Sequence, residues 1–365
     1  MDSRLKKATI WGGWAISLMF LGWAFWSIDF SKVVESFRMI NPVWLVPAFI
    51  LNFSILLVRT ARWNVFVEAV KPVRFISAFA ALCIGFMANM LLPARIGEIV
   101  RALVLAESED IPKGKAFGTV VVERAFDGLC VVILAMLVFA LITPTHVSAE
   151  SMYGMKLSAV FFSSVLILVF AATFMFHKRY RPVVWAIEVF TGLLPEKWGV
   201  KIRDFLESIR QGLHSIDHGH RILKIALWSI PVWGLAGPFN YCFIMAFGLD
   251  LPFSASFFVL ISQVVGLLIP SAPGFIGVYH AATMGGLMLY GVDQDMALSV
   301  AVLMHLVVFI AQTAPGFFFM WKMSYSLSDI RKKEEAAEEE GLETDLEADE
   351  ESSEKASPPS PVSGD

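Results

Sequence analysis

The residues with the clearest chemistry lie in the stretch NMLLPARIGEIVR, residues 89–101. Arg95, Glu98 and Arg101 follow one another at intervals of three in an otherwise apolar sequence. On a helix over 96–106, Glu98 and Arg101 share a face and can pair. Charge in hydrocarbon is costly, so these side chains need partners or a charged ligand. The amides at the start of this helix, beside Arg95, predict a place for an anionic group.

Two residues break the backbone of this stretch. Pro93 ends or kinks the helix that begins near Ile76, and Gly97 permits a tight backbone path. The alternative is a plain cytoplasmic loop whose arginines meet lipid phosphates at the membrane surface.

A second charged group follows in TVVVERAFDGL, residues 119–129. Glu123 and Asp127 are four residues apart and face one way on a helix, while Arg124 points aside. Arg95 or Arg101 are the obvious partners for these carboxylates. The cluster is either a structural ion-pair network or a site that also binds substrate.

A third stretch, PSAPGFIGVYHAA, carries almost no charge but contains several residues that interrupt a helix. Its prolines and glycines predict unwound backbone, with a new helix near the first glycine: Pro270, Pro273, Gly274 and Gly277. His280 follows, either as a satisfied core residue or as a group that links binding to protons. His305, further on, is a weaker case of the same kind.

Long apolar segments must position these groups. Hydrophobic residues make up 56% of the 365, charged residues only 17%, and apolar runs near twenty residues recur, which indicates a multi-spanning membrane protein. Six segments are long enough to cross: roughly 8–28, 43–63, 118–142, 157–177, 224–247 and 297–321. Two others, about 76–110 and 255–291, are apolar but interrupted.

Charge in the connections predicts what the interrupted segments do. Some connections are basic, which is typical of the cytoplasmic side: the N-terminus, 59–74, 178–224 and the region after Lys322. Others have almost no Lys or Arg: 143–156, 248–254 and 292–296. Each interrupted segment then begins and ends on one side. Its arms are short, so we expect two re-entrant hairpins, with both chain termini cytoplasmic.

We expect each half of the chain to contain two spans, then a hairpin, then a third span. Each half crosses an odd number of times, so the second half is inverted relative to the first, as in many transporters. The sequences ANMLLPARIG and VGLLIPSAPGFIG support this weakly, because each places a proline after an apolar run and then Ile-Gly. The predicted fold is all-α and polytopic, with about six transmembrane helices and two hairpins.

We expect residues 1–325 to form one transmembrane domain. Within it, 178–223 is a cytoplasmic segment whose apolar residues recur at helical spacing, which predicts an interfacial helix. Residues 326–365 form an acidic, then Ser/Pro-rich tail that we expect to be disordered. The formal charge of −4 conceals a basic body, because 13 of the 33 acidic residues follow Lys333.

Several chemistries find no support in the sequence. There is no HExxH, GxSxG or P-loop, no array of metal ligands and no sign of nucleic-acid binding, so we expect neither an enzyme nor a cofactor. Three cysteines, Cys83, Cys130 and Cys242, lie in apolar segments and are expected as core residues. Arg59 and Arg62, at a predicted helix end, are expected to be snorkelling anchors.

The pattern N-x-x-L-P-x-R-x-G-E-x-x-R, then E-R-x-x-D, then P-x-x-P-G-x-x-G, resembles the lysylphosphatidylglycerol synthase transmembrane-region family (UPF0104), also called the flippase-like domain. The resemblance covers nearly all of 5–325. In the bacterial multiple peptide resistance factor, such a domain is associated with moving aminoacylated phosphatidylglycerol between leaflets. It implies functional weight at these positions: Asn89, Pro93, Arg95, Gly97, Glu98, Arg101, Glu123, Arg124, Asp127, Pro270, Pro273, Gly274 and Gly277.

Two departures from the family pattern stand out. No aminoacyl-transferase domain follows the membrane part, so synthesis of lysyl-lipid is not expected. Phe275 and His280 stand where family members often have Gly and Glu. That difference bears on the substrate and on any coupling to ions.

The resulting expectation is a multi-pass protein of the bacterial inner membrane that moves a phospholipid or a polyprenyl-phosphate-linked lipid between leaflets. Arg95, Arg101 and Arg124 would hold the phosphate, while carboxylates orient them or recognise a cationic head group. Two alternatives stay open. One is an intramembrane transferase with a divalent ion on Glu123 and Asp127. The other is an accessory subunit whose tail recruits a partner. The chain could also form a homo-oligomer.

Overall fold

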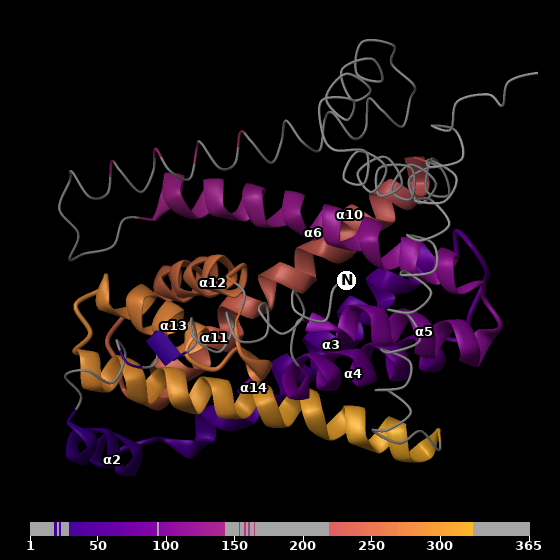
Figure 1. The fold of residues 1–365 in the computed structure, drawn as a ribbon. Helices are drawn as coiled ribbons and strands as arrows, with labels where there is room; N and C mark the ends of the chain where they lie inside the picture. Colours follow the sequence, from indigo (N-terminus) through magenta and orange to yellow (C-terminus); the bar gives the residue numbers. More distant parts are fainter. Residues whose placement is uncertain are drawn as a thin grey trace, which may run out of the picture.

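The computed structural model describes residues 29–92, 95–142, 219–269 and 271–323, with isolated positions at 18, 19, 22, 153, 157, 160 and 164. Every regular element in these ranges is a helix, which confirms the predicted all-α class (Figure 1). The predicted spans 8–28 and 157–177, the interfacial segment and the acidic tail lie essentially outside the described residues.

Four helices are long and apolar enough to cross a membrane. They run over Pro42–Val67, Lys113–Leu141, His220–Ala246 and Gln294–Lys322. These helices coincide in position with the predicted spans at 43–63, 118–142, 224–247 and 297–321. In element terms they are η1 (Pro42–Trp44) with α3 (Leu45–Val67), α6 (Lys113–Leu141), α10 (Gly219–Gly234) with α11 (Ala236–Ala246), and α14 (Gln294–Lys322).

The two interrupted segments are pairs of short helices that pack on each other. In the first hairpin, α4 (Phe75–Leu91) packs on α5 (Gly97–Glu109). In the second hairpin, α12 (Phe253–Leu267) is followed by the single turn η3 (Pro273–Phe275) and by α13 (Val278–Met288), which packs back on α12. Re-entry into a membrane stays a prediction. One predicted boundary was wrong: the second helix of this hairpin, α13, begins at Val278 and not near Gly274. Gly274 and Gly277 have φ angles of 68° and 87°, which a right-handed helix does not allow.

Helix α14 runs along both hairpins (Figure 1). Its C-terminal half packs on α4 so closely that a Cβ added at Gly316 would overlap the Met87 side chain. Its N-terminal half packs on α13. Helix α3 contacts α4 from the first half of the chain and both α10 and α11 from the second. Two hydrophobic clusters result, one centred on the first hairpin and the other on the second hairpin with α11 and α14.

One residue in each hairpin break has a positive φ angle, and the two residues are at equivalent places in the sequence. Arg95 and Phe275 occupy the same place in the sequences PARIG and PGFIG, and their φ angles are 57° and 58°. This left-handed conformation is uncommon for residues other than glycine. The sequence echo between the hairpins is therefore matched by an echo in backbone geometry.

Gly97 closes the first hairpin. A Cβ at this position would overlap the carbonyl of Gly85 on α4. The Gly97 N–H donates to Asn89 Oδ1 at 2.8 Å, so a side chain near the end of α4 caps the start of α5. Gly97 is thus needed because α4 and α5 approach each other closely, and its amide is already occupied.

A short helix, α2 (Phe30–Arg38), precedes the spans and was not predicted. Asp29 caps it by accepting from Ser31 N–H at 2.9 Å. Lys32 and the Asp29 amide both reach Asp295 at the start of α14, at 3.3 and 3.0 Å. Helix α2 therefore fastens the N-terminal side of the described chain to α14.

Candidate functional site

Six charged side chains from α3, α5 and α6 form one ion-pair network. Arg62 on α3 reaches Glu123 at 2.9 Å and Asp127 at 2.6 Å on α6. Arg101 on α5 reaches Glu123 at 2.7 Å and Glu98 at 2.7 Å. The predicted pairing of Glu98 with Arg101, and of Arg101 with a carboxylate of α6, is present.

Arg124 forms the outer edge of this network. Its guanidinium lies 3.0 Å from Asp127 and 3.6 Å from Glu98. Its side chain is 38% exposed, whereas Arg62, Arg101 and Glu123 are 1% exposed or less. The network thus has a buried part that joins three helices and an accessible part at Arg124 and Glu98.

Arg62 was expected to be a surface anchor, and this expectation was wrong. Its side chain has no solvent exposure, and it links both carboxylates of α6 to α3. Arg59, one turn earlier, was given the same role and instead lines a polar cavity. Both arginines follow a long apolar run on the same helix, three residues apart. That is the only signal in the sequence that could have placed them inside.

The polar cavity, of about 290 Å³, lies beside the network and between the hairpins. Its lining comes from both halves of the chain, including Arg95 and Phe275 of the two breaks. The polar lining residues are Asn52, Arg59, Asn89, Arg95, Glu98, Arg124, Asn240, Gln263, Tyr279, His305 and Gln312. The structure therefore brings Asn89, Arg95, Glu98 and Arg124 from the predicted site into one cavity.

Other predicted site residues do not line this cavity. Arg101, Glu123 and Asp127 belong to the network that supports Arg124 and Glu98. Pro93 and Pro270 lie outside the described residues. Pro273, Gly274 and Gly277 shape the tip of the second hairpin, and Gly274 packs against the Met90 carbonyl at the end of α4.

Arg95 and Arg59 differ from the other arginines of the site. The Arg95 guanidinium lies 5.2 Å from the centre of the Phe275 ring. Arg59 lies 5.9 Å from the Phe86 ring centre and 5.7 Å from that of Trp233. Among the described residues, neither guanidinium has a carboxylate oxygen within 4.0 Å.

Two histidines link the second hairpin to α14. The Gly277 N–H donates to His280 Nδ1 at 3.3 Å, so that nitrogen carries no proton. His280 Nε2–H can then donate to His305 Nδ1, 3.3 Å away. His305 Nε2–H in turn donates to the Gly274 carbonyl at 2.7 Å. This arrangement holds both rings neutral, and His280 is not part of the cavity lining.

Two amides from the second half of the chain, Asn240 and Gln263, also line the cavity. Asn240 on α11 donates to Gln263 Oε1 on α12 at 3.0 Å. Gln263 Nε2 donates to Tyr279 OH at 3.2 Å and to Thr283 Oγ1 at 3.1 Å on α13. Sequence reasoning missed these residues, because single amides in apolar helices have no distinctive spacing.

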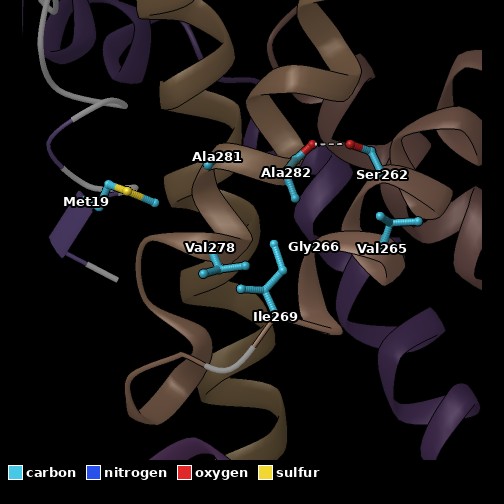
Figure 2. A pocket seen from close by; sticks show the side chains of 8 residues that line it. All are labelled: Met19, Ser262, Val265, Gly266, Ile269, Val278, Ala281 and Ala282. Carbon is cyan, nitrogen blue, oxygen red and sulfur yellow. Dashed lines mark hydrogen bonds between the residues drawn. The ribbon is translucent and has the colours of Figure 1, made fainter. Parts of the chain in front are cut away.

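A second pocket, of about 480 Å³, opens between α12 and α13 (Figure 2). Its lining is apolar apart from Ser262, whose hydroxyl donates to the Ala282 carbonyl at 2.6 Å. It shares no lining residue with the polar cavity. This apolar pocket suits a hydrocarbon chain rather than a head group.

In the part of the chain that the structure describes, no three His, Cys, Asp or Glu side chains converge as metal ligands. Glu123 and Asp127, the pair considered for a divalent ion, are each engaged by two or more arginines. The donor set at this point fits an ion-pair network better than a metal site.

The fold and the site together define a multi-pass helical membrane protein with a positively charged cavity between two broken helical segments. The chain belongs to the family described as the lysylphosphatidylglycerol synthase TM region, whose profile matches residues 10–316.

Its relatives include membrane proteins of archaea. A UPF0104 membrane protein of Pyrococcus horikoshii is 23% identical over 327 residues, which cover 85% of this chain and 95% of the relative. Another, from Methanothermobacter thermautotrophicus, is 26% identical and covers 78% and 87%. The glycosyltransferase AglD of Haloferax volcanii is 24% identical over 91% of this chain and 57% of its own length. No solved structure is significantly similar.

These comparisons contradict the expectation that the chain is not an enzyme. The family takes its name from a synthase, and one relative carries the name of a glycosyltransferase. The expectation rested on missing motifs such as HExxH and the P-loop. Those motifs belong to particular metal and nucleotide sites, so their absence says nothing about transfer chemistry built from other groups.

Proposed function

We propose that this protein binds the phosphate-bearing head group of a membrane lipid in the polar cavity and moves it between leaflets. The observation that carries the proposal is the meeting of both hairpin breaks at one cavity with a surplus of arginines. Broken helices of opposed repeats commonly form the substrate sites of transporters. Phospholipids and polyprenyl-phosphate-linked lipids both have the required group.

In this proposal the accessible arginines contact the head group. Arg95 and Arg124 line the cavity and present guanidinium groups suited to phosphate oxygens. Arg101 was expected to join them, but its buried guanidinium is occupied by Glu98 and Glu123. We therefore assign Arg101, Glu123 and Asp127 the role of holding α5 and α6 in position.

Hydrocarbon tails would stay in the membrane or in the apolar pocket between α12 and α13. The head group would then cross through protein while the tails remain in an apolar medium, which avoids placing phosphate in hydrocarbon. We also propose that both termini face the cytoplasm, as the basic connections indicate. Cysteines introduced near residues 70 and 250 should then be labelled from opposite sides.

The direct test is lipid movement in vesicles. Purified protein in liposomes should expose fluorescent phospholipid to a membrane-impermeant quencher faster than empty liposomes do. Arg95→Gln should lower this rate at least tenfold, because Arg95 lies in the cavity. Arg74→Gln is the matched control, since Arg74 is 73% exposed and outside the cavity. Equal rates for Arg95→Gln and wild type would contradict the proposal.

A second candidate is group transfer to a lipid bound in the same cavity. The relative named as a glycosyltransferase favours it. Purified protein incubated with a lipid phosphate and a nucleotide sugar would yield a lipid heavier by one sugar residue, detected by mass spectrometry. Loss of that product in Arg95→Gln would place the transfer at this cavity.

A further inference from the structure

The charged groups of the site do not balance. Five arginines contribute to the network and the polar cavity, but only three carboxylates do. Three arginines are paired within the network: Arg62, Arg101 and Arg124. The remaining two, Arg59 and Arg95, have no carboxylate within 4.0 Å among the described residues. Among the residues that the structure describes, the site therefore has two positive charges without a counter-charge.

Aromatic rings hold these two guanidinium groups in place. Arg95 rests over Phe275, and Arg59 lies between Phe86 and Trp233. Such contacts are attractive, but they leave the in-plane N–H donors free. No hydrogen bond from either side chain to another described residue is present. Both therefore retain donors that can point into the cavity they line.

We infer that the cavity is built for a lipid whose head group is a terminal phosphate monoester carrying two negative charges. This inference rests on the proposed function and narrows its substrate class. Two neighbouring cations without a carboxylate partner are best neutralised by one dianion. A phosphate monoester carries about −1.5 to −2 near pH 7, whereas the phosphodiester of ordinary phospholipids carries one charge. A zwitterionic head group would also bring a cation towards the arginines.

The size and neutral lining of the cavity agree with this class. About 290 Å³ lies at the low end for ligand sites, which favours a bare phosphate over a large sugar head group. Asn52, two helical turns before Arg59, is 6% exposed and lines the cavity. The side-chain N–H₂ group of Asn52 can donate to a phosphate or ester oxygen, because phosphate oxygens accept hydrogen bonds.

The experiment compares lipids that differ only in the number of phosphate substituents. Detergent-solubilised full-length protein is titrated at pH 7.5 with dioleoyl phosphatidic acid, dioleoyl phosphatidylglycerol or inorganic phosphate, and binding is measured by microscale thermophoresis. We expect phosphatidic acid to bind at least tenfold more tightly than phosphatidylglycerol. Arg59→Gln and Arg95→Gln should each reduce that ratio at least threefold, whereas Arg59→Lys should retain part of it and Arg74→Gln all of it.

Equal affinity for the two lipids, or a ratio that neither glutamine variant changes, overturns the inference. Inorganic phosphate that binds as tightly as phosphatidic acid shows that the dianion site serves a free anion, which overturns the lipid part. Vesicle assays separate this result from the proposed function. Movement of phosphatidylglycerol without a preference for phosphatidic acid retains the transport proposal and overturns the inference. Selective binding of phosphatidic acid without movement of either lipid retains the inference and overturns the transport proposal.

Discussion

The guanidinium of Arg95 lies 5.2 Å from the ring centre of Phe275, and the two residues occupy equivalent places in the two hairpin breaks. Both have positive φ, both follow a proline by two residues, and both precede Ile-Gly. The two hairpin breaks thus contact each other through residues whose φ angles are nearly equal. This contact brings an arginine to a cavity that neither hairpin could form alone.

The left-handed backbone of Arg95 allows two variants to separate the strain at this residue from its role in binding. Both variants remove the guanidinium, but only glycine relieves the strain. Arg95→Gly relieves a conformation that costs about 1–2 kcal/mol for a residue with a Cβ, whereas Arg95→Ala does not. We expect both variants to lose lipid movement but Arg95→Gly to be more thermally stable than Arg95→Ala. Thermal unfolding in detergent tests the order. Equal melting temperatures would show that the left-handed turn carries no such strain.

Removing Arg62 should destabilise the protein strongly. Arg62→Leu leaves Glu123 and Asp127 short of a buried partner, and breaking such pairs costs about 3–5 kcal/mol. The double variant Arg62→Leu with Asp127→Asn should recover part of that loss, because one buried charge is removed with its partner. Thermal unfolding of the four proteins of this cycle measures the coupling. Strictly additive effects would contradict direct pairing.

Gly97→Ala should disrupt the first hairpin. Its Cβ would overlap the Gly85 carbonyl, and backbone cannot move aside without separating α4 from α5. We expect poor folding, seen as aggregation in size-exclusion chromatography. Gly118→Ala on α6 is the matched control, since nothing lies within 4 Å of a Cβ there. That variant should be neutral or stabilised by about 0.5–1 kcal/mol.

The histidine pair should have fixed tautomers. We expect ¹⁵N spectra of histidine-labelled protein to show His280 and His305 both protonated at Nε2 and unprotonated at Nδ1, because Gly277 and Gly274 fix the two ends of the chain of hydrogen bonds. His280→Ala and His305→Ala variants assign the signals. A proton on His280 Nδ1 would contradict the arrangement and restore His280 as a candidate for proton coupling.

Local spacing predicted much of the site. Glu98 and Arg101 are three apart on α5, and helical geometry alone brings them together at 2.7 Å. The pairing of Arg101 with Glu123 followed from the cost of charge in an apolar setting. Four spans and both helix breaks were predicted for the same reason: apolar run length and proline or glycine act locally.

The missed features depend on contacts between distant segments. Arg62 is buried because α6 carries two carboxylates and α10 packs on α3. The sequence around residue 62 contains no information about either contact. The same holds for Asn240 and Gln263, whose hydrogen bond joins α11 to α12. Helix α2 was missed because its order depends on Asp295, more than 250 residues away.

The unlike side chains of Arg95 and Phe275 have a consequence for the junction of the two hairpins. If both turns carried arginine, two like charges would face each other at the junction and push the hairpins apart. If both carried phenylalanine, the junction would close but offer no cation at this point of the cavity. One arginine and one phenylalanine give an attractive contact, and the charge of the arginine remains available to bind an anion. The difference between Arg95 and Phe275 thus allows the junction to close and still to present a cation to an anion.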